Sequence, residues 1–254
     1  MKGHRFCVRI ALATAVLASA NFARGNPKGG TVSQGSATFN TSGSQFTVNT
    51  SDRAFINWQS FNIGVGETTT FVQPSSSSLV WNQINDPNPS QILGTLNANG
   101  YVVLQNSAGF YVGGQASITT HGLMLTTAPI PNLDLSSSDP WQFSAPPPSA
   151  GIINYGQINV GQGGSAFIIA NNVQNQGTIS APGGTIGLYA GKDVLVSSRP
   201  DGRGLSATVT LPSGSVDNEG KTDRRWRHHC AARASREPGR IDPGELGCER
   251  QRHD

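Results

Sequence analysis

Short apolar runs, separated by turns rich in Gly, Asn and Ser, fill most of the chain. Representative runs span residues 167–169, 185–189 and 194–196. Runs of three to five residues bounded by turn formers predict short β-strands. No helical periodicity accompanies them, so the pattern predicts an all-β fold.

The runs recur at a nearly constant spacing. At an offset of 22, three pairs of similar residues coincide: Leu96 with Ile118, Gly100 with Gly122, and Val103 with Leu125. An Asn-x-Gly triplet at Asn154 returns 21 residues later at Asn175, and again at Asn218, 43 residues further on, which equals two such periods. This period predicts one rung of a right-handed parallel β-helix, a single-stranded solenoid. Leucine-rich repeats would show their leucine spacing, and propeller blades would be twice as long.

Residues 30–220 have room for roughly eight or nine rungs, a rod of about 40 Å at the usual strand spacing. Backbone hydrogen bonds and stacked Ile, Val and Leu would stabilise it, and stacked Asn at the corners can add side-chain ladders. Two segments are expected to leave the rod: residues 129–150, which are too rich in proline for a central strand, and residues 197–211, which predict an extra hairpin. We therefore expect a solenoid with an N-terminal cap and extra-helical hairpins.

The first twenty residues predict a signal peptide, residues 1–20. Basic residues precede an apolar run at residues 10–17, and Ala18-Ser-Ala20 provides a small-x-small cleavage site. The run is shorter than the roughly 20 apolar residues that span a bilayer. We expect a mature chain that begins near Asn21 and has no transmembrane segment.

Charge and cysteine are both scarce in the body of the chain. Residues 1–218 contain nine Lys or Arg and eight Asp or Glu. Such a nearly neutral body gives no electrostatic footprint for nucleic acid or an anionic membrane. Residues 21–218 contain no cysteine, although small secreted domains usually rely on disulfides. Avoiding them suits a chain that must stay unfolded while it threads a pore.

Residues 221–254 form a charged tail with 15 charged residues in 34 and no strand pattern. One interpretation is a disordered tail. We favour a shifted reading frame, because Trp226 has a single codon. Read one nucleotide later, the codons of residues 226–229 give Gly, a variable residue and two residues that are Ile or Thr, if Arg227 uses a CGN codon. That restores the Gly-Gly-Thr-Ile type of rung at residues 183–186.

Five motifs follow one another in the first half of the chain: Phe61-Asn-Ile-Gly-x-Gly-Glu67, Phe71-x-Gln-Pro-Ser75, Trp81-Asn-Gln-Ile84, Asn88-Pro-Ser-Gln-Ile-Leu-Gly94 and Asn106-Ser-Ala-Gly-Phe110. In this order and spacing they resemble the secretion domain of two-partner-secretion exoproteins, the filamentous haemagglutinin family. The resemblance covers residues 30–127, with generic β-helix beyond.

The family carries an Asn-Pro-Asn-Gly-Ile signature without which export fails. Asn106 and Gly109 match its first and fourth places, but Ser107 and Ala108 replace the family's Pro and Asn. Proline would fix φ and stiffen the turn, and asparagine would tolerate left-handed backbone. The resemblance therefore implies weakened recognition by the transporter.

The resemblance implies export through the periplasm of a bacterium with a Gram-negative-type outer membrane, to a secreted or cell-surface location. An outer-membrane transporter would engage the chain through its POTRA domains and barrel. The full-length protein would be an adhesin or haemagglutinin that meets a host-surface glycan or protein. The candidates for transporter recognition and folding nucleation are Asn82, Asn88, Pro89, Ser90, Gly94, Asn106, Gly109, Gly113 and Gly122. The same residues also fit turn formers needed only for folding.

Residue types suited to catalysis are scattered, so we expect no enzyme, no cofactor and no metal site. Asp193 and Asp217 come nearest to rung spacing, and His121 is the only histidine between the signal and the charged tail. A polysaccharide-acting β-helix would need clustered carboxylates. A carbohydrate-binding module would need a planar row of exposed aromatics, although most are expected to pack in the core or cap. The candidates for that row are Trp58, Trp81, Tyr101, Phe110, Tyr111 and Trp141.

Overall fold

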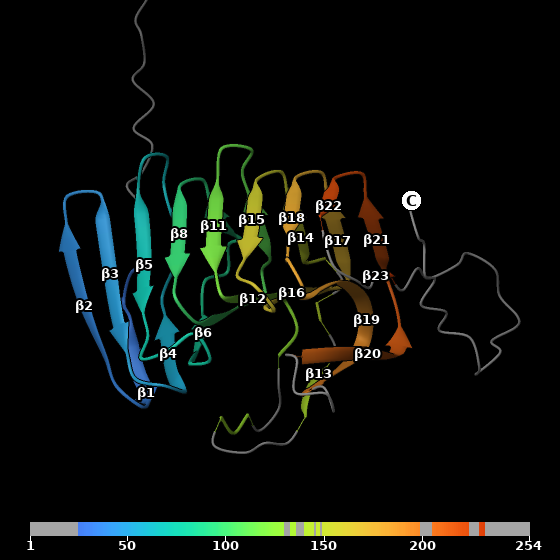
Figure 1. Cartoon of the computed structure of the whole chain (residues 1–254), viewed down its shortest axis with the longest axis horizontal. Helices are drawn as coiled ribbons and strands as arrows, with labels where there is room; N and C mark the ends of the chain where they lie inside the picture. The colour runs from blue at the N-terminus through green and yellow to red at the C-terminus, as the bar shows by residue number, and fades with distance from the viewer. Residues whose placement is uncertain are drawn as a thin grey trace, which may run out of the picture.

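The computed structural model describes residues 25–129, 133–135, 140–144, 146–147, 149–198 and 205–223, together with the backbone of residues 229–231. Its strands stack side by side along one axis, and the stack begins with the hairpin of β2 and β3 (Figure 1). Successive turns of the chain add parallel strands to three sheets, which we call I, II and III. The predicted all-β parallel β-helix is confirmed.

Sheet I lies crosswise beneath the other two in the view of Figure 1. Its path is β1 (Thr31–Gln34), β4 (Ala54–Trp58), β6 (Leu79–Ile84), β9 (Tyr101–Asn106), β12 (Gly122–Thr126), β16 (Ser165–Ala170), β19 (Thr185–Ser198) and β13 (Trp141–Ser144). Two further strands also pair with β19: β20 (Leu205–Pro212) and β23 (His229–Ala231).

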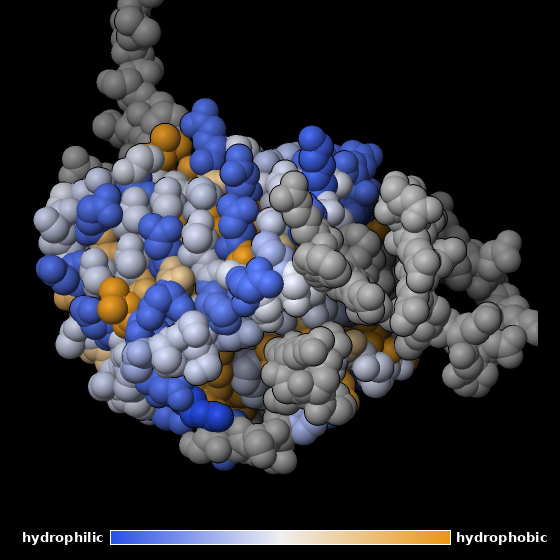
Figure 2. Space-filling model, viewed as in Figure 1, coloured by the Kyte–Doolittle hydropathy of each residue, from blue (hydrophilic) through white to orange (hydrophobic). Residues whose placement is uncertain are grey.

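Sheets II and III form the other sides of the coil, and the outer surface of sheet II, which faces the reader, is mostly polar (Figure 2). The path of sheet II is β2 (Ala37–Ser42), β3 (Gln45–Thr50), β5 (Thr68–Val72), β8 (Thr95–Ala98), β11 (Ser117–Thr120), β15 (Gln157–Val160), β18 (Thr178–Ser180) and β22 (Lys221–Asp223). The path of sheet III is β7 (Ser90–Ile92), β10 (Phe110–Val112), β14 (Gly151–Asn154), β17 (Asn172–Asn175) and β21 (Ser215–Asn218).

The described part of the solenoid is shorter than predicted. Seven strands, β3 to β22, form the parallel ladder of sheet II, so six circuits separate its ends. The expected eight or nine rungs are therefore too many. The cap and the extra-helical segments use residues that the constant period had assigned to the rod.

The strand registers test the predicted period directly. Between β8 and β11 of sheet II the offset is 22, because Ile118 pairs with Leu96. Between β9 and β12 of sheet I the offset is 21, so two predicted alignments are wrong: Gly122 pairs with Tyr101 and not with Gly100, and Val103 pairs with Met124 and not with Leu125. Two residues connect β8 to β9, whereas only one connects β11 to β12. A slip of one residue moves a side chain to the other face of a strand, which explains why the turn length matters.

An asparagine ladder runs along one corner, as predicted. The side-chain amide of Asn154 donates to Asn175 Oδ1 at 2.7 Å, and that of Asn175 donates to Asn218 Oδ1 at 2.8 Å. Because β21 pairs directly with β17, the 43 residues between the last two rungs are one enlarged circuit. The expectation of two ordinary periods there is wrong, since the hairpin of β19 and β20 fills the additional length.

Sheet I is apolar on both of its faces. One face belongs to the solenoid interior, whereas side chains such as Trp81, Met124 and Phe167 point to a second apolar cluster outside it. The predicted extra-helical segments cover that cluster, because β13 pairs antiparallel with β19 and places Phe143 against Trp81. A sheet covered on both faces has nearly continuous apolar strands, which matches β12 and β16.

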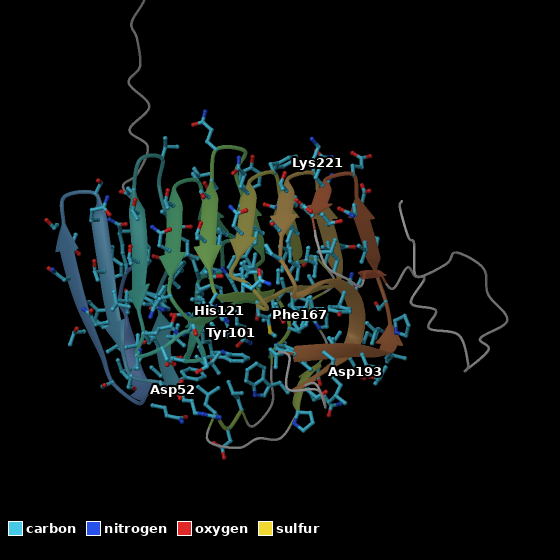
Figure 3. All side chains as sticks on the ribbon, viewed as in Figure 1. Asp52, Tyr101, His121, Phe167, Asp193 and Lys221 are labelled. Atoms are coloured by element: carbon cyan, nitrogen blue, oxygen red, sulfur yellow. The ribbon has the colours of Figure 1, made fainter. Side chains whose placement is uncertain are left out.

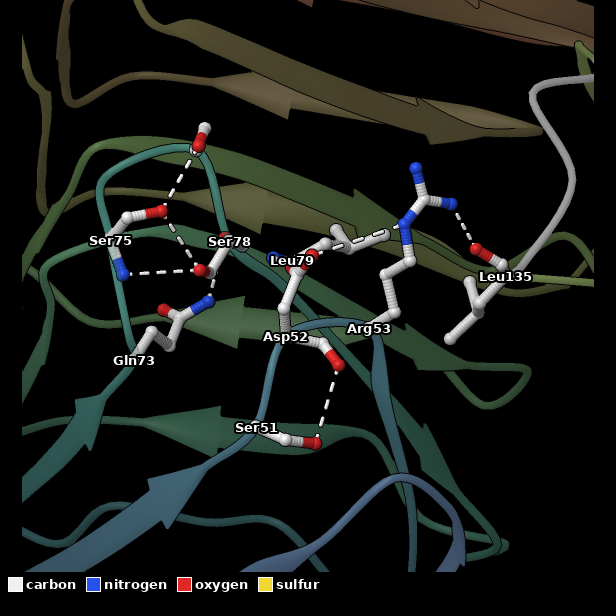
Figure 4. Close-up of polar contacts among 9 residues, drawn as sticks. Ser51, Asp52, Arg53, Gln73, Ser75, Ser78, Leu79 and Leu135 are labelled. Atoms are coloured by element: carbon white, nitrogen blue, oxygen red, sulfur yellow. Dashed lines mark hydrogen bonds and ion pairs between the residues drawn. The ribbon is translucent and has the colours of Figure 1, made fainter.

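A polar clamp ties this covering to the start of the stack (Figure 4). Arg53 donates from Nη1 to the carbonyl oxygen of Leu135, and Asp52 Oδ1 accepts the Leu79 N–H at 2.9 Å. Arg53 has a φ of 53°, the left-handed backbone that non-glycine residues rarely adopt. The turn before β4 thus contacts both the next circuit and the extra-helical segment.

The predicted domain boundaries lie close to the two ends of the described residues. The parallel ladder continues through β22, just beyond the boundary expected at residue 220. The expected signal peptide, residues 1–20, lies outside the described residues, as does most of the charged tail. Within the described ranges, no helix is long and apolar enough to cross a membrane.

Candidate functional site

The turn at residues 106–109 is built around one fully buried asparagine. Asn106 ends β9, and its Oδ1 accepts the Ala108 N–H at 2.9 Å while its carbonyl accepts the Gly109 N–H at 3.0 Å. Gly109 has a φ of 112°, and a Cβ there would lie 2.5 Å from the carbonyl oxygen of Gly151. Both the backbone conformation and the close neighbour therefore require glycine.

Asn106 also joins this turn to the preceding circuit. Its Nδ2 donates to Ser90 Oγ at 2.9 Å and to the Asn88 carbonyl at 3.2 Å. In return, the Ser90 N–H donates to the Gly109 carbonyl at 3.0 Å. Ser90 is buried, so these bonds are sheltered from water. Four of the predicted residues, from two sequence motifs, therefore meet in one network.

Asn88 and Pro89 are the exposed part of this network. The Asn88 backbone N–H and its Nδ2 donate to Asp86 Oδ1 at 2.9 and 3.0 Å, which shapes the loop between β6 and β7. A protein partner that bound the folded domain here would touch these two residues and not Asn106.

The replaced signature positions do not open the turn. Ser107 is exposed and Ala108 is half-buried, and the bonds between Asn106 and Gly109 close around them. Ser107 occupies the second position of the turn, where proline is favoured because its fixed φ suits that place. The substitutions therefore remove stiffness while the hydrogen-bonded shape is kept.

Asn82 lies in the solenoid interior, away from this turn. Its Oδ1 accepts the indole N–H of Trp58 at 2.9 Å, and its Nδ2 donates to the Val103 carbonyl at 3.1 Å. A buried amide needs such partners, because an unpaired polar group in a core costs stability. Asn82 thus holds three consecutive strands of sheet I together.

Three candidate glycines allow adjacent circuits to approach closely. A Cβ on Gly94 would lie 2.3 Å from the carbonyl oxygens of Gly64 and Glu67. Added Cβ atoms on Gly113 and Gly122 would meet the Leu93 side chain at 2.8 Å and the Tyr101 ring at 2.1 Å, respectively.

Comparison with known proteins agrees with this geometry. The family model of the TPS (two-partner secretion) secretion domain matches residues 23–224. The chain belongs to this family. A crystal structure of the HMW1 secretion domain from Haemophilus influenzae superposes with a TM-score of 0.71 and 32% identity, covering 78% of this chain and 53% of that one.

Two curated relatives are both described as heme/hemopexin-binding proteins of Haemophilus influenzae. The first is 29% identical over 206 residues, which cover 78% of this chain and 23% of the relative. The second is 37% identical over 94 residues, which cover 37% of this chain and 10% of the relative. The TPS domain described here thus spans less than a quarter of these relatives.

Two buried polar side chains of the TPS domain lie within the quoted motifs but were not among the candidates. Glu67 Oε2 accepts the N–H groups of Gly25 at 2.9 Å and Gly64 at 2.8 Å, so it fixes the N-terminal segment to the stack. Gln73 Nε2 donates to the Ser78 carbonyl at 2.8 Å (Figure 4) and to the Tyr101 carbonyl at 3.1 Å. A single charged residue in a charge-poor stretch was the available signal for Glu67, and a polar residue after the apolar pair Phe71-Val72 was the signal for Gln73.

The described residues of the TPS domain contain no group of three or more His, Cys, Asp or Glu that could hold a metal ion. Asp193 and Asp217 lie on strands of different sheets, β19 and β21. The His121 ring packs edge-on against Tyr101, with ring centroids 5.4 Å apart (Figure 3). Burial raises the pKa of Tyr101 above its usual value of 10.0.

Most of the six aromatic candidates pack inside the protein, as expected. Trp58, Trp81 and Phe110 are buried, and Tyr101 and Trp141 are half-buried. Of the six candidates, Tyr111 alone is exposed. These six residues therefore do not form the planar exposed row that the carbohydrate-binding alternative would need.

Proposed function

We propose that residues 30–130 are the module that a TPS outer-membrane transporter engages through its POTRA domains, and that they then start the β-helix outside the cell. Membership of the TPS family makes the protein an exoprotein that is exported and secreted through an outer membrane. The single observation that supports nucleation is the Asn106 network, in which one buried side chain bonds two successive circuits.

Stacking gives this folding a direction. A later circuit finds its backbone partners only on the circuit before it, because the sheets are parallel and each strand pairs with its counterpart one turn earlier. A folded stack is wider than an extended chain, so it opposes return through a pore. The absence of cysteine from residues 21–218 removes premature disulfides as an obstacle to threading.

For the full-length protein we propose a non-enzymatic role in binding at the cell surface, as an adhesin or haemagglutinin. The names of the curated relatives describe binding of heme and hemopexin, and not catalysis. The matched segment is less than a quarter of each relative, so we assign export and folding to this segment.

A secretion assay tests this proposal. The full chain is expressed with and without its transporter, and the protein released to the medium is measured. We expect release only with the transporter. Asn106→Ala should reduce release and slow refolding from urea, because it removes a buried amide that bonds two circuits. Asn97→Ala, on the outer face of sheet II, is the matched control. Equal release with and without the transporter would overturn the proposal.

Recognition and folding can be separated with the exposed loop. Asn88→Ala combined with Pro89→Ala leaves the buried Asn106 side chain in place. If the transporter contacts this loop, release falls while the refolding rate stays the same. If release is unchanged and only Asn106→Ala lowers it, the signature acts through folding alone.

A further inference from the structure

An exposed pair of tyrosines stands on sheet III. Tyr111 and Tyr155 are 39% and 38% exposed, and their ring centroids are 5.7 Å apart with the ring planes tilted by 56°. Most large aromatic side chains of the described residues lie in the two apolar clusters. These two rings therefore form an exposed aromatic surface that does not belong to either apolar cluster.

The strand register explains how the pair is formed. Tyr111 points outward from β10, and Tyr155 follows β14, whose last residue pairs with Val112. Gly113 follows β10, and its N–H donates to the Ile92 carbonyl at 2.9 Å. It therefore lies between Leu93 and Tyr155 on adjacent circuits. A Cβ on Gly113 would lie 2.8 Å from the Leu93 side chain and 3.7 Å from the Tyr111 ring, so the glycine lets both side chains lie close to the backbone between the two tyrosines.

The immediate surroundings of the pair are polar and uncharged; the carboxylate of Glu219, two circuits beyond Tyr155, accepts a hydrogen bond from Gln176 Nε2 at 3.1 Å. Strands β7, β10, β14 and β17 contain no Asp, Glu, Lys or Arg. Amide side chains lie on neighbouring circuits instead: Gln91, which precedes Tyr111 in the register, and Gln174 and Gln176, which follow on β17 and just after it. An uncharged aromatic surface bordered by amides matches an uncharged ligand that has both C–H and hydroxyl groups.

We propose that Tyr111 and Tyr155 form a stacking subsite for a neutral sugar ring. The apolar C–H face of a pyranose fits the negative face of an aromatic ring, and amides can bond its hydroxyl groups. The exposed parts of two tyrosines amount to roughly 150 Å² in all. That area suits one or two sugar rings and is far below the about 800 Å² that each partner buries in a stable protein interface. This inference does not depend on the proposed transport.

The test uses the purified full chain and four probes: maltotetraose, cellotetraose, N-acetylchitotetraose and, as the charged comparison, a heparin tetrasaccharide. Saturation-transfer NMR and titration calorimetry measure binding. We expect at least one neutral probe to bind with a dissociation constant on the order of 1 mM. Tyr111→Ala and Tyr155→Gln should each weaken it about tenfold or more. The second substitution introduces the residue type that Gln176 supplies on the next circuit, so it preserves the fold.

Two controls make the result decisive. Tyr111→Phe keeps the ring and should leave binding within about threefold, whereas Val72→Ser changes an exposed apolar residue of sheet II and should leave it unaffected. Thermal unfolding of every variant confirms that the fold persists. The proposal fails if no neutral probe binds, if only the heparin tetrasaccharide binds, or if binding survives Tyr155→Gln unchanged.

Discussion

Gly94 shows how little space separates two circuits. The atoms that an added Cβ would meet belong to the backbone carbonyls of Gly64 and Glu67, which cannot rotate away. We predict that Gly94→Ala destabilises the domain by about 1–3 kcal/mol, the usual cost of overpacking. Urea denaturation measures this. Gly114→Ala is the matched control, because nothing lies within 4 Å of the added atom. It should be neutral or stabilise by about 0.4–1 kcal/mol, and equal losses for the two variants would contradict the prediction.

We predict that Tyr101 makes the free energy of unfolding depend on pH in the alkaline range. Because burial raises its pKa above 10.0, the folded state keeps the phenolic proton at pH values where the unfolded chain has lost it. This contribution to stability is complete below the unfolded pKa and is lost as pH rises through the raised value. Denaturation between pH 8 and 11 should show a steeper loss for the native sequence than for Tyr101→Phe; the pH range follows the usual tyrosine pKa of about 10. An equal loss of stability with pH for the native sequence and for Tyr101→Phe would refute the prediction.

Ser107 offers a gain in stability at the signature turn. Proline is favoured at the second position of such a turn, because it restricts the unfolded chain more than the folded one. We predict that Ser107→Pro raises the free energy of unfolding by about 0.4–1 kcal/mol. Chemical denaturation measures the change, and Ser107→Ala serves as the control that should not produce it. A loss of stability on Ser107→Pro would show that the backbone at this position is not compatible with proline.

At the scale of the element, Phe143 is the fully buried aromatic side chain that anchors β13. Phe143 is fully buried against Trp81, with ring centroids 6.1 Å apart and planes at 14°. We predict that Phe143→Ala, which costs about 3–5 kcal/mol at a buried site, releases this segment from sheet I. Limited proteolysis should then cut between β12 and β14 while far-UV circular dichroism keeps its β signal. Leu211→Ala, at an exposed position of β20, should resist cleavage like the native chain.

The elements also show what the sequence could predict. Local repetition was sufficient for the approximate period and for the Asn154–Asn175 step of the ladder, because both depend on residues one circuit apart. The hairpin of β19 and β20 was predicted from its turn-forming sequence instead. The second apolar cluster could not be predicted. It depends on contacts such as Arg53 with Leu135, 82 residues apart, and Trp81 with Phe143. A strand that is buried on one face and a strand that is buried on two faces are each rich in apolar residues. Composition therefore did not show that sheet I is covered on its outer face as well.

The candidate site was predicted in a similar way. Motif spacing identified Asn106, Ser90 and Gly109, and the structure brings them together. Motif spacing could not show that Asn106 is buried, nor that Glu67 holds the N-terminal segment. Those facts follow from how successive circuits face one another, which a linear pattern does not contain.

At the scale of the whole molecule, the register supports the proposed frame shift. β21, β22 and β23 pair with β17, β18 and β19 at the same offset of 43, and His229 stands opposite Ile186. Read one nucleotide later, the codons place Gly at position 226 and Ile or Thr at position 229, which correspond at this offset to Gly183 and Ile186. We predict that shifting the frame near residue 224 yields a chain with a higher melting temperature. Thermal unfolding of both versions measures it, and an early stop codon or a continued charged run would contradict it.

The first strands give the stack a polarity. β1 runs antiparallel to β4 and β2 antiparallel to β3, so the first edges of sheets I and II are already occupied by strands of opposite direction. β1 and β2 are therefore the edge strands at this end, and they are short, with four and six residues. Short edge strands are one way in which proteins limit pairing with foreign chains. A further strand that ran in the direction of the coil would lie antiparallel to β1 or β2, so it could not extend the parallel ladders of sheets I and II here. Additional rungs of these two ladders can be added only at the far end, which gives growth of the rod a single direction.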